Sequence, residues 1–576
     1  MTDTPWRAFL IHTPLQRDVT GTDDGSEPPQ RFLPRRFGPQ PSATAEAVGR
    51  PRRRGITPLK RGVNESCAGM GRNLSSVPRP RSFTSLAARL SFIVHRSSFP
   101  VIALAGFLLN AHGAANPSSE AAATNRLPKI LVAPGGRGFV TERGKPFVPF
   151  GVSYYRPHTG WAPQLWKQFD PEATGADFAK LRELGANCVR VFLSYGSFYQ
   201  EPGVLSAEGL AKFDQFLSLA EAAGLYVHPT GPDHWEGTPP WARGDRYADE
   251  QMLAAAEYFW KLFASRYRGH NVIFAYDLLN EPEIRWDTAP MRDKWNSWLR
   301  EEYGTPAKLA AAWGLTNQPP ALDNVPVPSA KDAPGDRQLL DFQRFRESVA
   351  VEWTRRQAAA VKVADPKALV TVGLIQWSVP VLLGGVRHYS AFRPQKVAPW
   401  LDFLEIHFYP LANGFYEYGQ PEGEARNLAY LESVVREVAR PGKPVVVAEF
   451  GWYGGGQLTI DQGKHPPASE EQQAQWCRQV VERTAGLATG WLNWGCHDHP
   501  EARDVSQLTG LFTVDGKVKA WGRAFQELAK RYGNRALPAP KPVVRPVLDW
   551  DRCVTSLQAA SQFREACFQA FKAEVK

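Results

Sequence analysis

Eight short apolar segments of strand type alternate with helical patterns along the chain, and this alternation restricts the fold more than any other feature. The strand-like segments are Phe147–Tyr155, Asn187–Leu193, Leu225–Thr230, Val272–Leu279, Leu369–Ile375, Phe403–Phe408, Pro444–Phe450 and Gly490–Gly495. The helical patterns are Gly175–Leu184, Ala207–Ala223, Asp249–Tyr267, Gln338–Val363, Leu428–Val438, Ser469–Ala488 and Ala520–Tyr532. Such alternation implies parallel strands joined by right-handed crossovers. It predicts an α/β fold, a closed (β/α)8 TIM barrel.

Two of the predicted strands end in a single glutamate. One ends in Asn280-Glu281-Pro282, and the other, P-V-V-V-A, ends in Glu449. An acidic residue at one strand end is most often a turn or helix cap. Two of them at the C-terminal face of a barrel, where enzymes of this fold carry their chemistry, supply the paired carboxyl groups that acid/base or nucleophilic catalysis requires. No GxGxxG or Walker pattern follows any of these strands, which disfavours a nucleotide-binding function.

The first 96 residues differ in composition from the rest. They contain 15 Arg and one Lys against seven Asp and Glu, which leaves only +1 of the formal charge of +10 for the remaining chain. Pro, Arg, Ser and Gly dominate without periodicity, so we predict a disordered basic leader over residues 1–96. Because the folded part is nearly neutral, we expect no nucleic-acid partner.

Residues 97–115 have the pattern of a secretory signal. The apolar run Phe99–Leu109 is preceded by Arg and followed by small residues. At 11 residues it is too short for a stable span of a bilayer core of about 30 Å, although a membrane anchor is the alternative interpretation. We therefore expect an exported protein, secreted or periplasmic, with no stable membrane span in its mature form. Met70 would be the better start for such a signal, so we expect residues 1–69 not to belong to the natural product.

The catalytic domain is predicted to cover residues 130–535, after a linker at 116–129. It opens with turn-separated short strands in Val132–Pro149, which we interpret as a β-hairpin that caps the barrel. The connection after the fourth strand is long and contains two further helical patterns, Met291–Tyr303 and Pro306–Trp313. An insertion on the active face usually shapes the substrate site.

The chain ends in a Pro-rich linker, residues 536–548, and a short helical tail, residues 549–576. The six Cys have no CxxC or Cys/His spacing, which argues against a zinc site. In one continuous tail helix the sulfurs of Cys553 and Cys567 would lie about 21 Å apart. They can form a disulfide only if the tail bends.

The motifs at the strand ends resemble those of retaining glycoside hydrolases of clan A. L-L-N-E-P at Leu278–Pro282 and V-A-E-F-G-W at Val447–Trp452 are similar to the acid/base and nucleophile motifs of family 5, the cellulase and mannanase family. The resemblance covers roughly residues 130–530. Further matches occur in order on the expected strands, at Arg190, His228, His407, Tyr409 and Trp494. The segment Trp295–Gly314 is also similar to the β-galactosidases of family 42.

This resemblance implies a role for each matching residue. Glu449 would be the nucleophile and Glu281 the acid/base. Asn280 would bind the sugar 2-hydroxyl, Arg190 would hold Glu449 ionised, and Tyr409 would orient it. The remaining matches would bind hydroxyls or carboxylates, in the case of His228 and His407, or form the floor under the sugar, in the case of Trp494.

Some positions have a second interpretation. His228 could be a core histidine with satisfied hydrogen bonds, and His234 competes for its role. Four further tryptophans are either sugar platforms or loop packing: Trp235, Trp241, Trp377 and Trp452.

The sequence thus predicts a retaining β-glycoside hydrolase that acts on β-linked poly- or oligosaccharides, β-mannan or β-glucan, with a carbohydrate as its partner and no metal or cofactor. The alternatives are a β-galactosidase-type exo-glycosidase of the same clan and a non-catalytic carbohydrate-binding barrel. Binding alone would not need both Glu281 and Glu449. The sugar, its linkage, endo or exo action, the oligomeric state and the role of the tail stay open.

Overall fold

The computed structural model describes residues 126–575, except 161–162, 318–319, 411–417, 419–420 and 461–464. The predicted leader and signal region, and most of the linker that follows them, lie outside the described residues. Within the described ranges, no helix is both long enough and apolar enough to cross a membrane.

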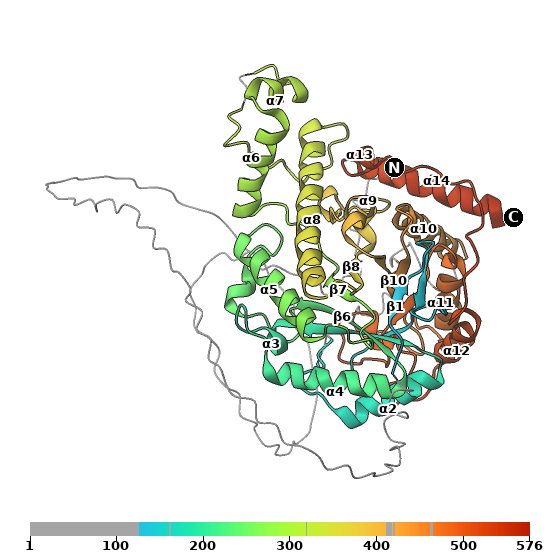
Figure 1. Ribbon diagram of the computed structural model, residues 1–576. Coiled ribbons are helices and arrows are strands. Elements are labelled where there is room, and N and C mark those ends of the chain that lie inside the picture. The colour runs from blue at the N-terminus through green and yellow to red at the C-terminus, as the bar shows by residue number, and fades with distance from the viewer. Residues whose placement is uncertain are drawn as a thin grey trace, which may run out of the picture. The chain divides into compact units, whose positions relative to one another are not determined.

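Eight parallel strands close into a barrel, as the sequence predicts (Figure 1). They are β4 (Phe150–Ser153), β5 (Cys188–Ser194), β6 (Tyr226–Asp233), β7 (Tyr276–Asn280), β8 (Val370–Leu374), β9 (Leu404–Phe408), β10 (Val445–Phe450) and β11 (Trp491–Trp494). Each strand pairs with its neighbours in chain order, and β11 pairs with β4 to close the ring. All eight predicted strands are therefore confirmed.

Helices cover the outside of the barrel (Figure 1). They are α2 (Pro171–Glu183), α3 (Tyr195–Phe198), α4 (Ala207–Ala223), α5 (Glu250–Arg266), α8 (Arg337–Ala364), α9 (Pro394–Val397), α10 (Pro421–Ala439), α11 (Glu470–Thr484) and α12 (Ala520–Tyr532). Short 3-10 turns occur at Pro240–Arg243, Gln376–Ser378, Val386–His388, Ala398–Trp400 and Val505–Leu508. Several helices begin after a side chain that accepts a hydrogen bond from the first turn, as at Asp170, Ser206 and Ser469.

A small antiparallel sheet closes the N-terminal end of the barrel. It contains β1 (Ile130–Val132), β2 (Phe139–Thr141) and β3 (Pro146–Phe147), so the predicted hairpin is present with a third strand added. Phe139 packs edge-on against Phe274 and Phe403 inside the barrel, each at 5.1 Å between ring centroids. These rings form an apolar floor, and polar groups can accumulate only above it.

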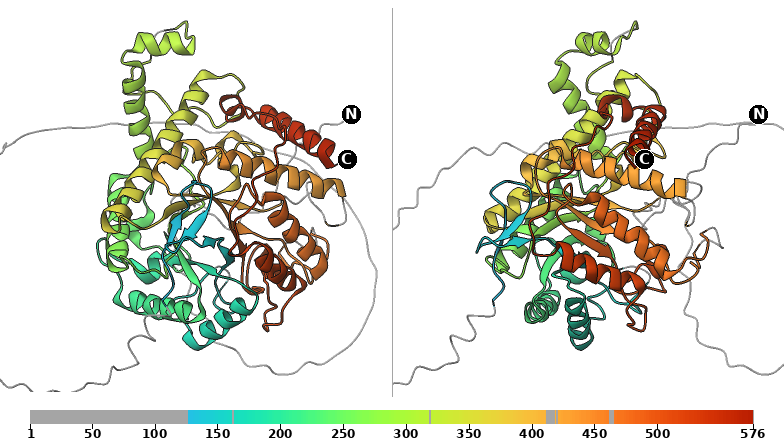
Figure 2. Two further views of the ribbon diagram at one scale, coloured as in Figure 1. Left: turned by 45° about the vertical axis from the view of Figure 1, so that its right-hand side comes forward. Right: turned by 90° about the vertical axis from the view of Figure 1, so that its right-hand side faces the viewer.

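The insertion after β7 forms α6 (Ala289–Tyr303) and α7 (Pro306–Trp313), as predicted. Both helices extend away from the barrel alongside α8 (Figure 2). Trp295 of α6 is fully buried and packs between Trp298 and Trp313 on one side and Phe345 of α8 on the other. The insertion is thus anchored on α8 by aromatic contacts.

The tail consists of two helices, α13 (Trp550–Cys553) and α14 (Leu557–Val575), rather than one continuous helix. α14 lies along the outside of α10, where Arg426 forms an ion pair with Glu565 at 2.5 Å (Figures 1 and 2). Cys553 and Cys567 are both buried free thiols.

Two strands are irregular at their C-terminal ends. Opposite β9, Val447 pairs with Ile406 but Glu449 pairs with His407, so Ala448 is an extra residue in β10. Opposite β8, Asp277 pairs with Thr371 but Asn280 pairs with Gly373, so β7 also has one residue more than its partner. A β-bulge of this kind reverses the face to which the following side chains point.

A buried lysine joins the loops that follow β10 and β11. Lys519 is 1% exposed, and its Nζ donates to both carboxylate oxygens of Asp498, at 2.9 and 3.1 Å, and to the carbonyl oxygens of Gly454 and Leu508. Burial raises the pKa of Asp498 to about 6, and Lys519 opposes this shift. The ion pair thus fixes two loops at the C-terminal face of the barrel.

We predict that Lys519→Met destabilises the fold by about 3–5 kcal/mol at pH 8, because it leaves Asp498 buried without a counter-charge. The loss should shrink at pH 5, where Asp498 becomes protonated. Urea denaturation at the two pH values measures both effects. Lys517→Met is the matched control, since its pair with Asp515 is exposed and the unfolding midpoint should not move. An equal midpoint for both variants would contradict a stabilising role of the buried pair.

Candidate active site

Arg190 of β5 lies at the centre of the candidate active site. Its guanidinium is fully buried and donates to Glu449 at 2.6 Å, to Asp277 at 2.9 Å and to Asn280 at 2.8 Å. Burial works to lower the pKa of Arg190, but Glu449 and Asp277 outweigh burial and raise it above its ordinary value. One permanent positive charge is therefore shared between two carboxylates.

Glu449 lies at the end of β10, turned into the barrel after the bulge. Oε1 accepts from Arg190, and Oε2 accepts from the hydroxyl of Tyr409 at 3.0 Å. Burial raises the pKa of Glu449 to about 7, against the lowering effect of Arg190 and of the Tyr409 hydrogen bond. Burial and Glu449 together raise the pKa of Tyr409 well above its usual range, so the phenol stays protonated and donates.

Glu281 faces Glu449 from the end of β7. It has a left-handed backbone, with φ of 43°, a conformation that costs a non-glycine residue about 1–3 kcal/mol. His407 Nδ1 lies 3.0 Å from Glu281 Oε1 and 3.5 Å from Glu449 Oε1. One oxygen of each carboxylate and a His407 nitrogen all lie within 4.8 Å of one another. Burial and Arg190 hold the pKa of His407 well below its usual value, so this bridging ring is neutral.

Gly373 of β8 makes room for this arrangement. Its amide donates to Asp277 and its carbonyl oxygen accepts from the amide of Glu281, each at 2.8 Å. A Cβ at this position would lie 3.0 Å from His407 Nε2 and 3.1 Å from Asp277 Oδ2. A side chain here would displace the imidazole or the carboxylate.

Aromatic side chains form one wall above the charged groups. The cluster contains Tyr155, Phe192, Trp235, Tyr409 and Trp494. Trp494 packs 5.2 Å from Tyr155, and its Nε1 donates to Ser506 at 2.6 Å, which fixes the plane of the indole. An aromatic surface beside two carboxyl groups suits a sugar ring, whose C–H faces pack on π systems.

The other candidate tryptophans differ in their surroundings. Trp241 packs on Tyr195 and Tyr199, and Trp452 is buried against Tyr453, so both serve loop packing. The Nε1 of Trp377 donates to Glu283, close along the chain to Glu281.

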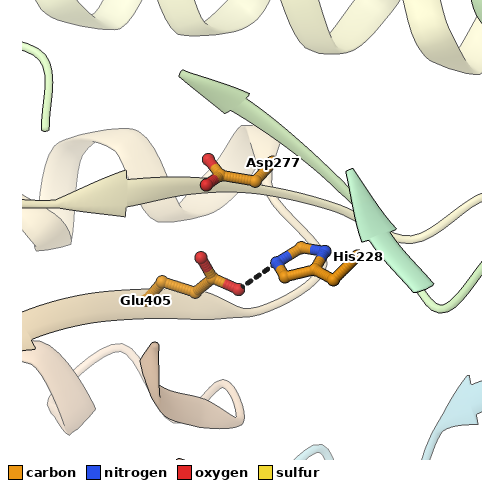
Figure 3. A group of neighbouring side chains, drawn as sticks. All are labelled: His228, Asp277 and Glu405. Carbon is orange, nitrogen blue, oxygen red and sulfur yellow. Dashed lines mark hydrogen bonds and ion pairs between the residues drawn. The ribbon is translucent and has the colours of Figure 1, made fainter. Parts of the chain in front are cut away.

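His228 lies in a group with Asp277 and Glu405 (Figure 3), separate from the group of Glu281, His407 and Glu449. It is fully buried, with Nδ1 2.9 Å from the Ala275 carbonyl oxygen and Nε2 2.6 Å from Glu405 Oε1. Both nitrogens already have hydrogen-bond partners. These contacts fit a core histidine and leave no nitrogen for direct contact with a sugar. His234 is part-exposed, bonds to Asp233 at 2.5 Å and stacks on Trp235 of the aromatic wall.

Two buried acids, Asp277 and Glu405, were not among the predicted site residues. Asp277 accepts from Arg190, Thr230 and the Gly373 amide, and Glu405 pairs with His228. A charged residue inside an apolar strand segment, as in Y-D-L-L and L-E-I-H, is the signal that could have identified both. With His228 they have the composition of a metal site, but hydrogen bonds already occupy Asp277 and the His228 nitrogens.

Comparison with known proteins gives a family and two curated relatives. The sequence matches the family Cellulase (glycosyl hydrolase family 5) over residues 140–499. The β-galactosidase BgaA of Thermus sp is 27% identical over 290 residues, 45% of this chain and 41% of that protein. A β-xylosidase of Phanerodontia chrysosporium is 27% identical over 139 residues, 23% of this chain and 28% of that protein. The chain thus spans less than half the length of these relatives.

Solved structures share the fold. GH5_18 from Streptomyces cattleya, solved in complex with Manb1-4GlcNAc, has a TM-score of 0.52 and 18% identity and covers 74% of this chain and 92% of that chain. The β-galactosidase of Rahnella sp. R3 has a TM-score of 0.54 and 16% identity, covering 67% and 56%.

The family match and the fold agree, because residues 140–499 include all eight strands of the (β/α)8 barrel. Because the match extends over more than half of the sequence, the chain belongs to glycosyl hydrolase family 5.

We predict that Gly373→Ala lowers kcat/KM on a β-glycoside by roughly 10- to 100-fold, since it displaces His407 or Asp277. Circular dichroism should show that the fold is kept. Gly138→Ala is the control, because no atom lies within 4 Å of its added Cβ. Native kcat/KM in a folded Gly373→Ala variant would mean that the close packing does not position the catalytic groups.

Proposed function

We propose that the chain is a retaining β-glycosidase in which Glu449 is the nucleophile and Glu281 the acid/base. The observation that carries this proposal is that one oxygen of Glu281 and one oxygen of Glu449 lie within 4.8 Å of each other. Retaining enzymes hold their carboxyl groups about 5–5.5 Å apart, whereas inverting enzymes leave about 6.5–9.5 Å for a water molecule. The short separation supports direct attack by one carboxylate.

The environments of the two glutamates support this division of roles. Glu449 receives hydrogen bonds from Arg190 and Tyr409, which favour its ionised form and orient its lone pairs. Its ionised carboxylate attacks the anomeric carbon while Glu281 donates a proton to the leaving oxygen. The products of this step are a glycosyl ester on Glu449 and a free alcohol.

The second step reverses the proton transfer. Once Glu449 is esterified, its negative charge is gone, and Glu281 can act as the base that removes a proton from an incoming water. That water attacks the same anomeric carbon, so the product keeps the β configuration. Asn280 supports both steps: its Oδ1 accepts from Arg190, so the amide NH2 is the group left to bind a sugar hydroxyl.

For the substrate we propose short β-linked oligosaccharides or chain ends, with β-mannosides first. GH5_18 of Streptomyces cattleya, which shares the fold over most of its length, is bound to Manb1-4GlcNAc. β-Galactosides are the second candidate, because BgaA is 27% identical over 290 residues, 45% of this chain. Hydrolysis of nitrophenyl β-mannoside, β-galactoside, β-glucoside and β-xyloside, compared by kcat/KM, distinguishes these substrates.

Nucleophile and acid/base variants test the mechanism. We expect Glu449→Ala to lose about 10⁴-fold or more of kcat/KM, and Glu281→Ala roughly 10²–10⁴-fold, least on activated aryl glycosides. Azide should then yield the α-glycosyl azide with Glu449→Ala and the β-glycosyl azide with Glu281→Ala. Glu208→Ala, which removes an exposed glutamate on α4, is the control. Exchange of the two azide anomers between the variants would reverse the assigned roles, and native turnover in both would refute the mechanism.

The pH dependence tests the role of Tyr409. Only ionised Glu449 attacks, so kcat/KM should fall as pH drops through about 7. Since Tyr409 lowers the pKa of Glu449, Tyr409→Phe should move this acid limb to higher pH, by roughly one unit. Tyr155→Phe, in the same aromatic cluster but without a hydrogen bond to Glu449, should leave it in place. An unmoved limb in Tyr409→Phe would show that the phenol does not set the ionisation of the nucleophile.

A further inference from the structure

A second layer of ionisable side chains lies below the catalytic glutamates, between them and the apolar floor. It consists of His228 on β6, Asp277 on β7 and Glu405 on β9, all with no solvent exposure (Figure 3). The rings of Phe274 and Phe403 pack beneath His228, at 5.6 and 6.2 Å. Because these side chains have no solvent exposure, they can influence the glutamates above them only through charge and hydrogen bonds.

The hydrogen bonds fix where the protons are. A carbonyl oxygen only accepts, so Nδ1 of His228, facing the Ala275 carbonyl, carries a hydrogen. Nε2 lies 2.6 Å from Glu405 Oε1, and a second proton must occupy this contact, because two lone pairs would repel at that distance. Whether this proton is on the ring or on the carboxyl group, the His228–Glu405 pair has a net charge of zero.

The remaining oxygen of Glu405 supports this assignment. Oε2 is buried and has no hydrogen-bond partner among the described residues, and it is turned toward Asp277 in Figure 3. Asp277 accepts hydrogen bonds from Arg190, Thr230 and the Gly373 amide. These donors suit an ionised carboxylate, so the negative charge of the two acids belongs on Asp277. A second bare charge on Glu405 at this place would be both unsolvated and repelled.

Arg190 couples this proton to the ionisation of the nucleophile, Glu449. Its single positive charge already serves Asp277 and Glu449. If Glu405 became a third bare carboxylate beside them, less of the field of Arg190 would remain to stabilise ionised Glu449. Both members of the pair favour their protonated form. Burial lowers the pKa of His228, but Glu405 outweighs burial and raises it. Burial also raises the pKa of Glu405.

We propose that Glu405 is a positioning residue, which with His228 retains one proton beneath the nucleophile and thereby reserves Arg190 for Asp277 and Glu449. The other ionisable groups facing the pair are Cys188 and His407. Burial and Glu405 raise the pKa of Cys188, and burial and Arg190 lower that of His407, so both are neutral. The inference rests on the proposed role of Glu449, and it assigns a function to a carboxyl group that touches no substrate.

The test compares charge-matched variants of the full chain by the pH dependence of kcat/KM. His228→Gln keeps a donor toward Glu405 but removes the ring that shares the proton. If His228 is needed to keep the pair neutral, Glu405 ionises alone in this variant, and the acid limb should move up by at least about half a pH unit. Glu405→Gln leaves a neutral pair, and its acid limb should match the native one. The double variant His228→Gln/Glu405→Gln removes the uncompensated charge and should bring the limb back.

Two results would overturn the proposal. An unmoved limb in His228→Gln would show either that Glu405 stays neutral without the ring or that its charge does not reach Glu449, and both results refute the role assigned to the pair. A shift that persists in the double variant would assign the effect to the lost ring itself, not to the charge on Glu405.

A measurement without substrate separates this proposal from the proposed function. In nitrogen-15 histidine NMR spectra, assigned through His228→Gln, His228 should keep its Nδ1 hydrogen and show no titration from pH 5 to 9. Titration of His228 near pH 6.5, as for a solvent-exposed ring, would refute proton retention whatever the activity. A non-titrating ring in a chain that cleaves no glycoside would instead refute the function and leave the buried proton in place.

Discussion

One buried guanidinium holds the active site together. Arg190 contacts Glu449, Asp277 and Asn280 at once, and these residues come from two strands that are not neighbours in the barrel. A fully buried arginine is costly unless each donor is satisfied. Its five N–H groups therefore impose their geometry on the surrounding carboxylates, and the surrounding strands must deliver acceptors at those positions.

Much of the fold and most of the candidate site follow from sequence pattern. The eight strands and most helices lie within about four residues of their predicted bounds, since period-2 and period-3.6 apolar patterns report directly on buried faces, but α10 begins seven residues before the predicted Leu428. Arg190, Asn280, His407 and Tyr409 surround the two glutamates as expected, because parallel strands bring their C-terminal ends together.

Depth within the barrel could not be predicted in the same way. The strand pattern places His228 on an inward face but does not say whether it reaches the open end, and the structure puts it one layer lower, against Glu405. The bulge in β10 is also invisible to a period-2 pattern: regular alternation would place Glu449 on the same face as Val447, among the helices. Tertiary hydrogen bonds decide both positions: those to Ala275 and Glu405 hold His228 at its depth, and those from Arg190 and Tyr409 hold Glu449.

The bulges determine the direction in which the side chains of the motif point. The sequence V-A-E-F-G turns its glutamate into the barrel only because Ala448 is an extra residue relative to the neighbouring strand. Grafted onto a barrel strand of regular pairing, the same five residues would turn the carboxylate toward the surrounding helices. The position of this carboxylate therefore depends on the length of β10 as much as on the residue itself. A one-residue deletion in β10 would remove the bulge and turn the side chain of Glu449 out of the site.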